Sequence, residues 1–290
     1  MNRDVLTEEY AKFKELCPPE VLSTSRGEYI CYSLGKGDPA VLLLPGGLAD
    51  GEPFFSHLLA LQPFGRIITL RYPYIGSIAG YVTSLGELLD QLNCPEVCVM
   101  GHSFGGILAQ ALVRSDPRRF TKVLLSHTTA ADHRIPEEAL KKRLGALKKA
   151  YRLIKVLPGF MVRKINAKKL DRITSMMREE EREFWVSYFR DKFDAKERRE
   201  SLCMLKAMID FGAHYRYSPE DLKGWAGEML IIDSEGDNAI PRIERECVRR
   251  LYPRAERVTF EALGHMALLS ERDRYISLYK RFFFPETSEE

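Results

Sequence analysis

The sequence predicts an α/β fold in which a mostly parallel, doubly wound sheet carries an inserted helical cap. Short apolar runs alternate with amphipathic stretches over the first 126 residues, and the same alternation resumes near residue 229. Between these parts lies a strongly charged stretch with few strand signals. We therefore expect a core formed by residues 1–128 and 221–290, and a helical cap formed by residues 129–220.

The apolar runs predict strands that are covered on both faces. They lie at residues 40–44, 66–70, 96–100, 122–126, 229–233 and 257–260. Stretches with helical spacing lie between and after them, at residues 53–62, 85–92, 106–113, 243–251 and 267–283. Strands that alternate with helices are expected to pair in parallel through right-handed crossovers, which place helices on both faces of the sheet.

The composition is that of an ordinary globular protein, with 290 residues, 45% hydrophobic and 29% charged. Disordered and collagen-like classes are therefore excluded. The N-terminal residues lack the apolar segment of an export signal, and no run approaches the roughly 18 apolar residues that span a bilayer. The six cysteines are scattered without C-x-x-C pairs, which predicts reduced thiols and a cytoplasmic location.

The net charge of +3 hides a basic segment, because residues 134–216 carry 22 Lys and Arg against 12 Asp and Glu. This segment begins with a basic amphipathic helix. Its apolar positions are Leu140, Leu144, Leu147, Tyr151 and Ile154, and its cations are Lys141, Lys142, Arg143, Lys148, Lys149, Arg152 and Lys155. One interpretation is contact with an anionic membrane or an acidic ligand such as a phosphorylated acyl carrier. The other is a cap helix whose cations are simply solvated.

Residues 101–105 read Gly-His-Ser-Phe-Gly and match the pattern G-x-S-x-G. They follow a predicted strand and precede a predicted helix, where a sharp turn exposes the serine hydroxyl above the sheet. Glycine on either side tolerates the strained backbone of such a turn. Ser103 is therefore the candidate nucleophile. The alternative is a glycine-rich turn with a helix-capping serine.

A serine hydroxyl needs a base, and the base needs an orienting acid. Asp237 follows the predicted strand at residues 229–233, and His265 follows the last predicted strand. This order of serine, acid and histidine along the chain is the one found with G-x-S-x-G turns of this kind. We predict His265 as the base and Asp237 as the acid. Asp233 and Glu235 are near enough to compete with it. Asp233 is the rival for the acid, and its other interpretation is a strand-end or supporting group.

Acyl transfer also requires donors for the developing oxyanion. We predict the backbone N–H of Phe104, directly after the nucleophile, and the N–H of Gly47 in the turn after residue 44. Leu48 is the alternative to Gly47. The glycine-rich turn at residues 45–47 also fits a tight turn that merely ends a strand.

Together, the turn at residues 44–47, the segment 101–106, Asp237 and His265 resemble the α/β-hydrolase superfamily over about residues 28–128 and 225–285. The resemblance implies the α/β-hydrolase fold. A narrower set of segments resembles the maspardin-like branch. These segments are Phe54-Phe55, Leu59-Ala60-Leu61, Arg71-Tyr72-Pro73, Leu108-Ala109-Gln110 and residues 251–255.

The maspardin-like resemblance implies a non-catalytic binding or adaptor protein, in which the serine is kept and the histidine is missing. This chain departs from that pattern because His265 is present and His102 precedes the serine, as in many active esterases. Pro45 stands where the superfamily commonly has histidine before the oxyanion glycine, which leaves backbone donors unaffected. Ser103 excludes the members that use an aspartate nucleophile.

The predicted function is a serine hydrolase that cleaves a carboxylic ester, thioester or lactone through an acyl-enzyme on Ser103. The substrate is a small molecule with an apolar acyl group. Methionines and aromatic residues of the cap either line its pocket or pack the cap itself. The alternatives are the adaptor function and a C–C hydrolase or lyase with the same triad. No metal, cofactor or nucleic-acid signature is present, and nothing in the sequence indicates an oligomeric state.

Overall fold

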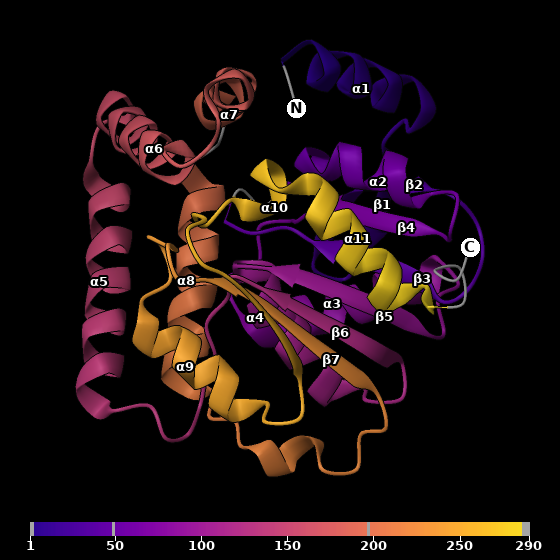
Figure 1. Ribbon diagram of the computed structural model, residues 1–290. Helices are drawn as coiled ribbons and strands as arrows, with labels where there is room; N and C mark the ends of the chain where they lie inside the picture. Colours follow the sequence, from indigo (N-terminus) through magenta and orange to yellow (C-terminus); the bar gives the residue numbers. More distant parts are fainter. Residues whose placement is uncertain (1–2, 48–49, 196–197, 286–290) are drawn as a thin grey trace.

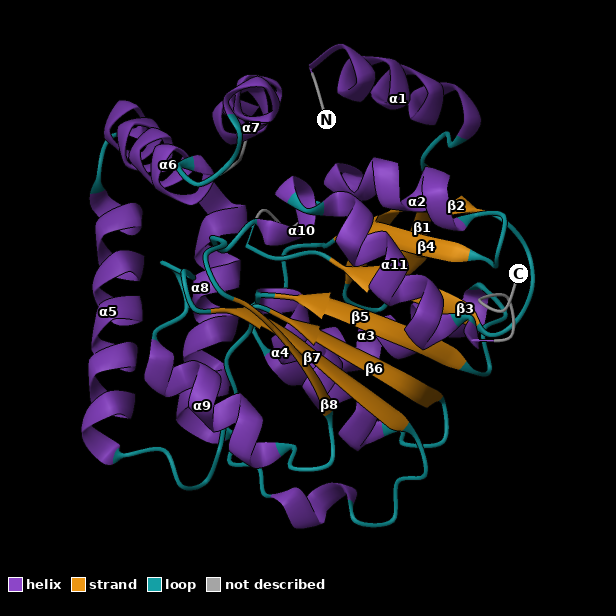
Figure 2. Ribbon diagram, in the orientation of Figure 1, coloured by secondary structure: helices purple, strands orange, loops and turns teal. Residues whose placement is uncertain are grey.

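The computed structural model of the chain describes residues 3–47, 50–195 and 198–285. Its strands are β1 (Glu20–Thr24), β2 (Gly27–Leu34), β3 (Ala40–Leu44), β4 (Ile67–Arg71), β5 (Val97–His102), β6 (Phe120–Ser126), β7 (Glu228–Ser234) and β8 (Glu256–Phe260). They form one sheet in the order β1-β2-β4-β3-β5-β6-β7-β8 (Figure 2). The pairs β1–β2 and β2–β4 are antiparallel, and the other pairs are parallel. The mostly parallel sheet confirms the predicted fold class.

Helices cover both faces of the sheet and extend beyond one end of it (Figure 1). Those of the core are α1 (Arg3–Leu16), α2 (Phe55–Leu61), α3 (Ile78–Gln91), α4 (Phe104–Ser115), α9 (Arg242–Leu251), α10 (Ala267–Ser270) and α11 (Arg272–Phe283). Those between β6 and β7 are α5 (Glu137–Val156), α6 (Gly159–Thr174), α7 (Glu179–Ala195) and α8 (Arg198–His214). Short 3₁₀ helices lie at Glu52–Phe54 and Pro219–Leu222. The helix expected over residues 267–283 is divided into two at Glu271.

Strand β3 shows how the sheet forms the core, because all five of its residues are buried. Ala40, Leu42 and Leu44 join a cluster that includes α3, α4 and α9. Val41 and Leu43 point to the other face and join a cluster that includes α1, α2 and α11. An unbroken apolar run is therefore required here, since alternate side chains enter two different apolar layers.

The four helices α5 to α8 lie within the segment predicted as the cap, beyond the ends toward which the arrows of β5 to β7 point (Figure 2). The carboxyl ends of parallel strands are where α/β sheets bind ligands. Helix α5 contains no buried residue. It is fixed to the core by Arg143, which forms an ion pair of 2.6 Å with the buried Glu244 of α9.

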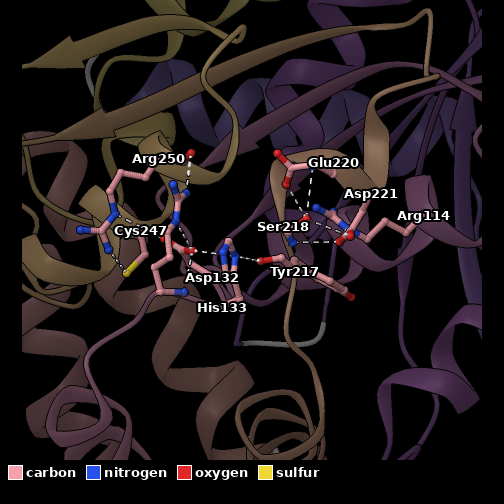
Figure 3. A network of polar contacts seen from close by, with 10 residues as sticks. Arg114, Asp132, His133, Tyr217, Ser218, Glu220, Asp221, Cys247 and Arg250 are labelled. Carbon is pink, nitrogen blue, oxygen red and sulfur yellow. Dashed lines mark hydrogen bonds and ion pairs between the residues drawn. The ribbon is translucent and has the colours of Figure 1, made fainter.

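The chain leaves and re-enters the core at adjacent points, where Asp132 and Tyr217 form a parallel bridge. The backbone N–H of His133 donates to the carbonyl of Tyr217 at 2.9 Å, and the N–H of Tyr217 donates to the carbonyl of Ala131 at 2.6 Å. Asp132 also pairs with Arg250 of α9 (Figure 3). Both connections of the cap are therefore held to each other and to the core.

Candidate active site

Ser103 occupies the sharp turn between β5 and α4. Its backbone angles are φ +52° and ψ −111°, in the region that residues with a side chain rarely adopt. The turn is held against β6, since the N–H of Ser103 donates to the carbonyl of Ser126 at 2.9 Å. Strain of this kind persists only where neighbouring structure fixes it, and it is concentrated at functional sites.

The glycines around Ser103 are explained by close packing of the backbone. A Cβ at Gly105 would overlap the carbonyl oxygen of Leu44, at the end of β3. A Cβ at Gly101 would overlap the carbonyl oxygen of Gly105. The turn can therefore pack this closely against itself and against the end of β3 only if both positions lack a side chain.

His265 and Asp237 lie side by side, although 28 residues separate them. Nδ1 of His265 is 3.0 Å from Oδ2 of Asp237 and 3.2 Å from Oδ1. Oδ1 also accepts hydrogen bonds from the N–H groups of Ala239 and Ile240, at 2.7 and 2.9 Å. Burial raises the pKa of the Asp237 carboxyl, but the hydrogen bond and charge of His265 outweigh it and hold this pKa below its ordinary value. Asp237 is thus an ionised carboxylate that orients the imidazole.

Asp233, the rival acid, is engaged elsewhere. Its two oxygens accept hydrogen bonds from Arg249 of α9, from Nε at 2.8 Å and from Nη2 at 2.7 Å. This bidentate pair leaves the carboxylate directed at a guanidinium and not at an imidazole. The structure therefore places Asp237, and not Asp233, against His265.

Ser103 and His265 line one cavity of about 400 Å³, a volume suited to a small-molecule ligand. Gly47 and Phe104 line the same cavity, whereas Leu48 lies outside the described residues. The N–H of Phe104 belongs to the first turn of α4, where backbone donors have no partner within the helix. The cavity thus brings together Ser103, His265 and both predicted oxyanion donors.

The methionines and aromatic residues of the cap have three different environments. Met204 and Met208 of α8 line the cavity. Met177, Phe184, Trp185 and Phe189 are buried in the apolar cluster that includes α1 and α2. Phe160, Met161 and Met176 are exposed. Part of the set therefore forms the pocket, part packs the cap, and part faces solvent, which neither sequence interpretation anticipated.

Two further histidines lie beside His265: His102, which the sequence analysis noted directly before the serine, and His127, which sequence reasoning missed. The ring centroid of His102 is 4.9 Å from that of His265, and the centroid of His127 is 6.0 Å away. Nδ1 of His102 and Nδ1 of His127 lie 3.3 and 3.2 Å from the hydroxyl of Ser126. The position of His127 could have indicated its role, because His127 directly follows β6, the strand that pairs with β5 before Ser103.

Burial keeps both neighbouring histidines neutral. It lowers the pKa of His127 to about 4 and the pKa of His102 well below its ordinary value, with a smaller contribution from His265 in each case. At neutral pH neither ring carries a charge. Neither neighbouring ring therefore opposes the action of the Asp237 carboxylate when His265 accepts a proton.

The described residues contain no group of three or more His, Cys, Asp or Glu side chains placed to hold a metal ion. The cations that line the cavity are Lys169 and Arg172 of α6. Among the helices of the described ranges, none is both long and apolar enough to cross a membrane.

This arrangement of strained serine, histidine and buried carboxylate on a mostly parallel sheet defines an α/β-hydrolase. Residues 41–278 match the model of the alpha/beta hydrolase family, and the chain belongs to that family. Among curated proteins, it is similar to maspardin of Danio rerio, with 24% identity over 95% of this chain and 86% of that protein. The resemblance to the maspardin branch is thereby confirmed.

Solved structures show the same fold. Carboxylesterase CesB of Bacillus subtilis has a TM-score of 0.68, with 15% identity over 97% of this chain and 98% of that chain. A meta-cleavage product hydrolase of Pseudomonas fluorescens has a TM-score of 0.64, with 20% identity over 91% and 97% of the two chains. At these identities the likeness concerns the fold alone.

Proposed function

We propose that this protein is a serine hydrolase that cleaves a carboxylic ester, thioester or lactone through an acyl-enzyme on Ser103. The observation that carries the proposal is the hydrogen bond of 3.0 Å between Asp237 and His265, since His265 lines the same cavity as Ser103. A serine, a base and an orienting carboxylate are the parts that acyl transfer requires. Free thiols at all six cysteines support a cytoplasmic location as part of this proposal.

In the proposed reaction, His265 takes the proton of the Ser103 hydroxyl while the oxygen attacks the acyl carbonyl. The N–H groups of Phe104 and Gly47 stabilise the oxyanion of the tetrahedral intermediate. His265 then gives the proton to the leaving alcohol or thiol, which departs as the C–O or C–S bond breaks. Water, deprotonated by His265, hydrolyses the acyl-enzyme and releases the carboxylic acid. Asp237 stabilises the imidazolium in both stages without taking the proton.

The apolar acyl group has a natural place in the cavity. Met204, Leu205 and Met208 of α8 form one part of the lining, and Leu268 and Leu269 form another. Methionine adapts to ligands of irregular shape. We therefore propose that these side chains hold the acyl chain of the substrate.

Labelling with a fluorophosphonate probe tests the proposal, with Ser103→Ala and His265→Ala beside the wild type. Ser201→Ala is the matched control, because this second serine lines the same cavity but has no histidine assigned to it. We expect labelling of the wild type and of Ser201→Ala, loss of labelling in the other two, and turnover of a p-nitrophenyl ester series that peaks at one chain length. Labelling that persists in Ser103→Ala would overturn the assignment of the nucleophile.

The likeness to maspardin makes an adaptor protein the second candidate. A folded wild type that neither binds the probe nor hydrolyses any ester would support the adaptor and contradict the hydrolase. The fold shared with a meta-cleavage product hydrolase makes C–C cleavage the third. Probe labelling at Ser103, combined with turnover of a β-diketone and none of the esters, would select that reaction.

A further inference from the structure

The corner where α5 meets α6 exposes an unusual group of large apolar side chains. Val156 is 74% exposed and Phe160 is 64% exposed, and Leu153, Met161 and Ile165 are also exposed. These residues surround the connection between the two helices, at one extremity of the molecule (Figure 1). Adjacent exposed apolar side chains of this size mark an interaction surface more often than isolated ones do. We call residues 153, 156, 160, 161 and 165 the apolar corner.

The surroundings of the apolar corner are cationic. Residues 139–170 contain eleven Lys and Arg and no Asp or Glu. Two of these cations have acidic partners, since Arg143 pairs with Glu244 and Lys141 pairs with Glu137. Seven further cations near the corner have no acidic side chain of the described residues within ion-pair distance. These cations are Lys148, Lys149, Arg152, Lys155, Arg163, Lys164 and Lys168.

The spacing along α6 places apolar and cationic side chains on the same face. Met161 and Ile165 lie four residues apart, as do Lys164 and Lys168, so these four side chains share one face of the helix. The opposite face of α6 carries Val162 and Leu170, which are buried. The exposed face is therefore amphipathic within itself.

The corner is also held in place. Arg198 of α8 donates hydrogen bonds to the carbonyls of Lys155 and Leu157, at 3.1 and 2.6 Å, where α5 ends. Two of the last carbonyls of α5 are thereby satisfied from the inner side of the corner. Val156 and Phe160 are thus presented by a fixed connection between two helices.

We propose that the apolar corner and its cations dock this protein on an anionic lipid surface. Phe160, Val156 and Met161 would enter the boundary between head groups and acyl chains, while the lysines and arginines contact anionic head groups. Long cationic side chains suit this position because their stems lie along apolar surface while the charge stays in water. Binding to nucleic acid would use the cations but would leave the aliphatic and aromatic side chains in contact with water.

The docking surface continues into the cavity of Ser103. Ile154 of α5 and Ile165 of α6 line that cavity, and Ile165 also belongs to the apolar corner. An acyl chain that leaves the lipid surface at the corner would therefore contact Ile165, which is also part of the cavity wall. The docking itself does not depend on hydrolysis.

Co-sedimentation of the full chain with vesicles tests the proposal, using phosphatidylcholine with or without phosphatidylserine. We expect binding only when phosphatidylserine is present, and weakening as salt is raised. The double variant Lys164→Glu and Lys168→Glu should bind at least about tenfold more weakly, because each cation near the surface contributes to the attraction. Phe160→Ser should lower the binding about tenfold as well.

Two controls separate docking from general charge and stickiness. Lys36→Glu with Lys223→Glu makes the same change of net charge at exposed sites outside the cap, and Val21→Ser removes another exposed apolar side chain, 57% exposed, on β1. Both should bind as the wild type does. Failure of the wild type to bind, or equal loss in the corner variants and the controls, would overturn the proposal. Ser103→Ala should bind normally, so a failure of the proposed hydrolase leaves this result intact.

Discussion

The sheet and the cap differ in what holds them together. Strands β3 and β5 are buried along their whole length, and alternate side chains of β3 enter two apolar clusters. Helix α5, which is longer than any strand, has no buried residue. The sheet is stabilised by burial of apolar surface, whereas α5 relies on half-buried side chains and on the ion pair between Arg143 and Glu244.

This difference separates two tasks. The sheet positions Ser103, His265 and Asp237, and the proposed acyl transfer would require their geometry to hold to within about an ångström. The cap supplies much of the cavity wall and the apolar corner, where local opening is tolerated. We therefore expect substitutions in the core to affect the chemistry and the global stability, and substitutions in the cap to affect local opening.

The largest effect is expected at Asp237, the carboxylate that follows β7. Asp237→Asn should lower kcat about 10⁴-fold, because an amide no longer holds the required tautomer of His265. Asp233→Asn is the matched control, since it weakens the pair with Arg249 and leaves the hydrogen bond between His265 and Asp237 in place. It should change kcat by less than about tenfold. Equal losses of kcat with the preferred ester would contradict the assignment of Asp237.

Acid should destabilise the core strongly. Burial lowers the pKa of His57 to about 3 and that of His127 to about 4, each from an ordinary value of 6.5. Between these pKa values the unfolded chain binds protons that the folded chain does not. The stability that the two neutral histidines contribute is therefore fully present above pH 6.5 and is lost as the pH falls toward 4. From pH 7.5 to 5.0 each histidine should lower the free energy of unfolding by about 2 kcal/mol.

Urea unfolding at the two pH values checks this expectation. The quantity compared between variants is the change in the free energy of unfolding from pH 7.5 to pH 5.0. His57→Leu should reduce the pH dependence by about 2 kcal/mol. Leu58→Ala, at a buried residue of the same helix that does not titrate, should leave it unchanged. A wild type whose unfolding free energy is the same at pH 5.0 and pH 7.5 would show that the buried histidines are protonated in the folded state.

A smaller effect, confined to the cap, is expected at Glu244. Glu244→Gln removes the charge that Arg143 faces, and it should favour local opening of α5 by roughly 3 kcal/mol. Amide hydrogen exchange in α5 should become more than about 100-fold faster. The control Glu246→Gln lies on the same helix but pairs with the exposed Arg242, so exchange should change little. Equal exchange in both variants would mean that the ion pair does not hold α5.

The smallest effect distinguishes the two regions most directly. Gly145 of α5 and Gly86 of α3 lie inside helices, and a Cβ at either position would meet no atom within 4 Å. Alanine should stabilise each helix by about 0.5–1 kcal/mol. Gly86→Ala should raise the midpoint of urea unfolding, whereas Gly145→Ala should slow exchange in α5 without moving that midpoint. A shift of the midpoint by both would indicate that the cap and the core unfold as one unit.

Much of the core could be predicted because its signals are strong. The apolar run at β3 matches the strand residue for residue, and the turn at Ser103 lies between the predicted strand and helix. The hairpin β1–β2 was missed, since β1 is largely exposed and lacks an apolar alternation. Helix α3 starts seven residues before its predicted beginning, where Ser77 caps it by accepting a hydrogen bond from the N–H of Gly80.

The cap and the surroundings of the site depend on contacts that sequence spacing does not reveal. Arg143 looks like one more solvated cation of the basic helix, yet it pairs with the buried Glu244, 101 residues further along the chain. His127 has no motif of its own and becomes part of the site only because β6 lies beside β5. Pairings of this kind are set by tertiary packing and not by local pattern.

The bridge between Asp132 and Tyr217 has a consequence for how such proteins diversify. Because the cap departs and returns at one place, its removal or exchange would leave two chain ends already within bonding reach, and closing them requires only a short connection. The helices between those ends form one continuous insertion into the core. A change in these helices would alter the cavity wall without changing the strands that precede Ser103, Asp237 and His265.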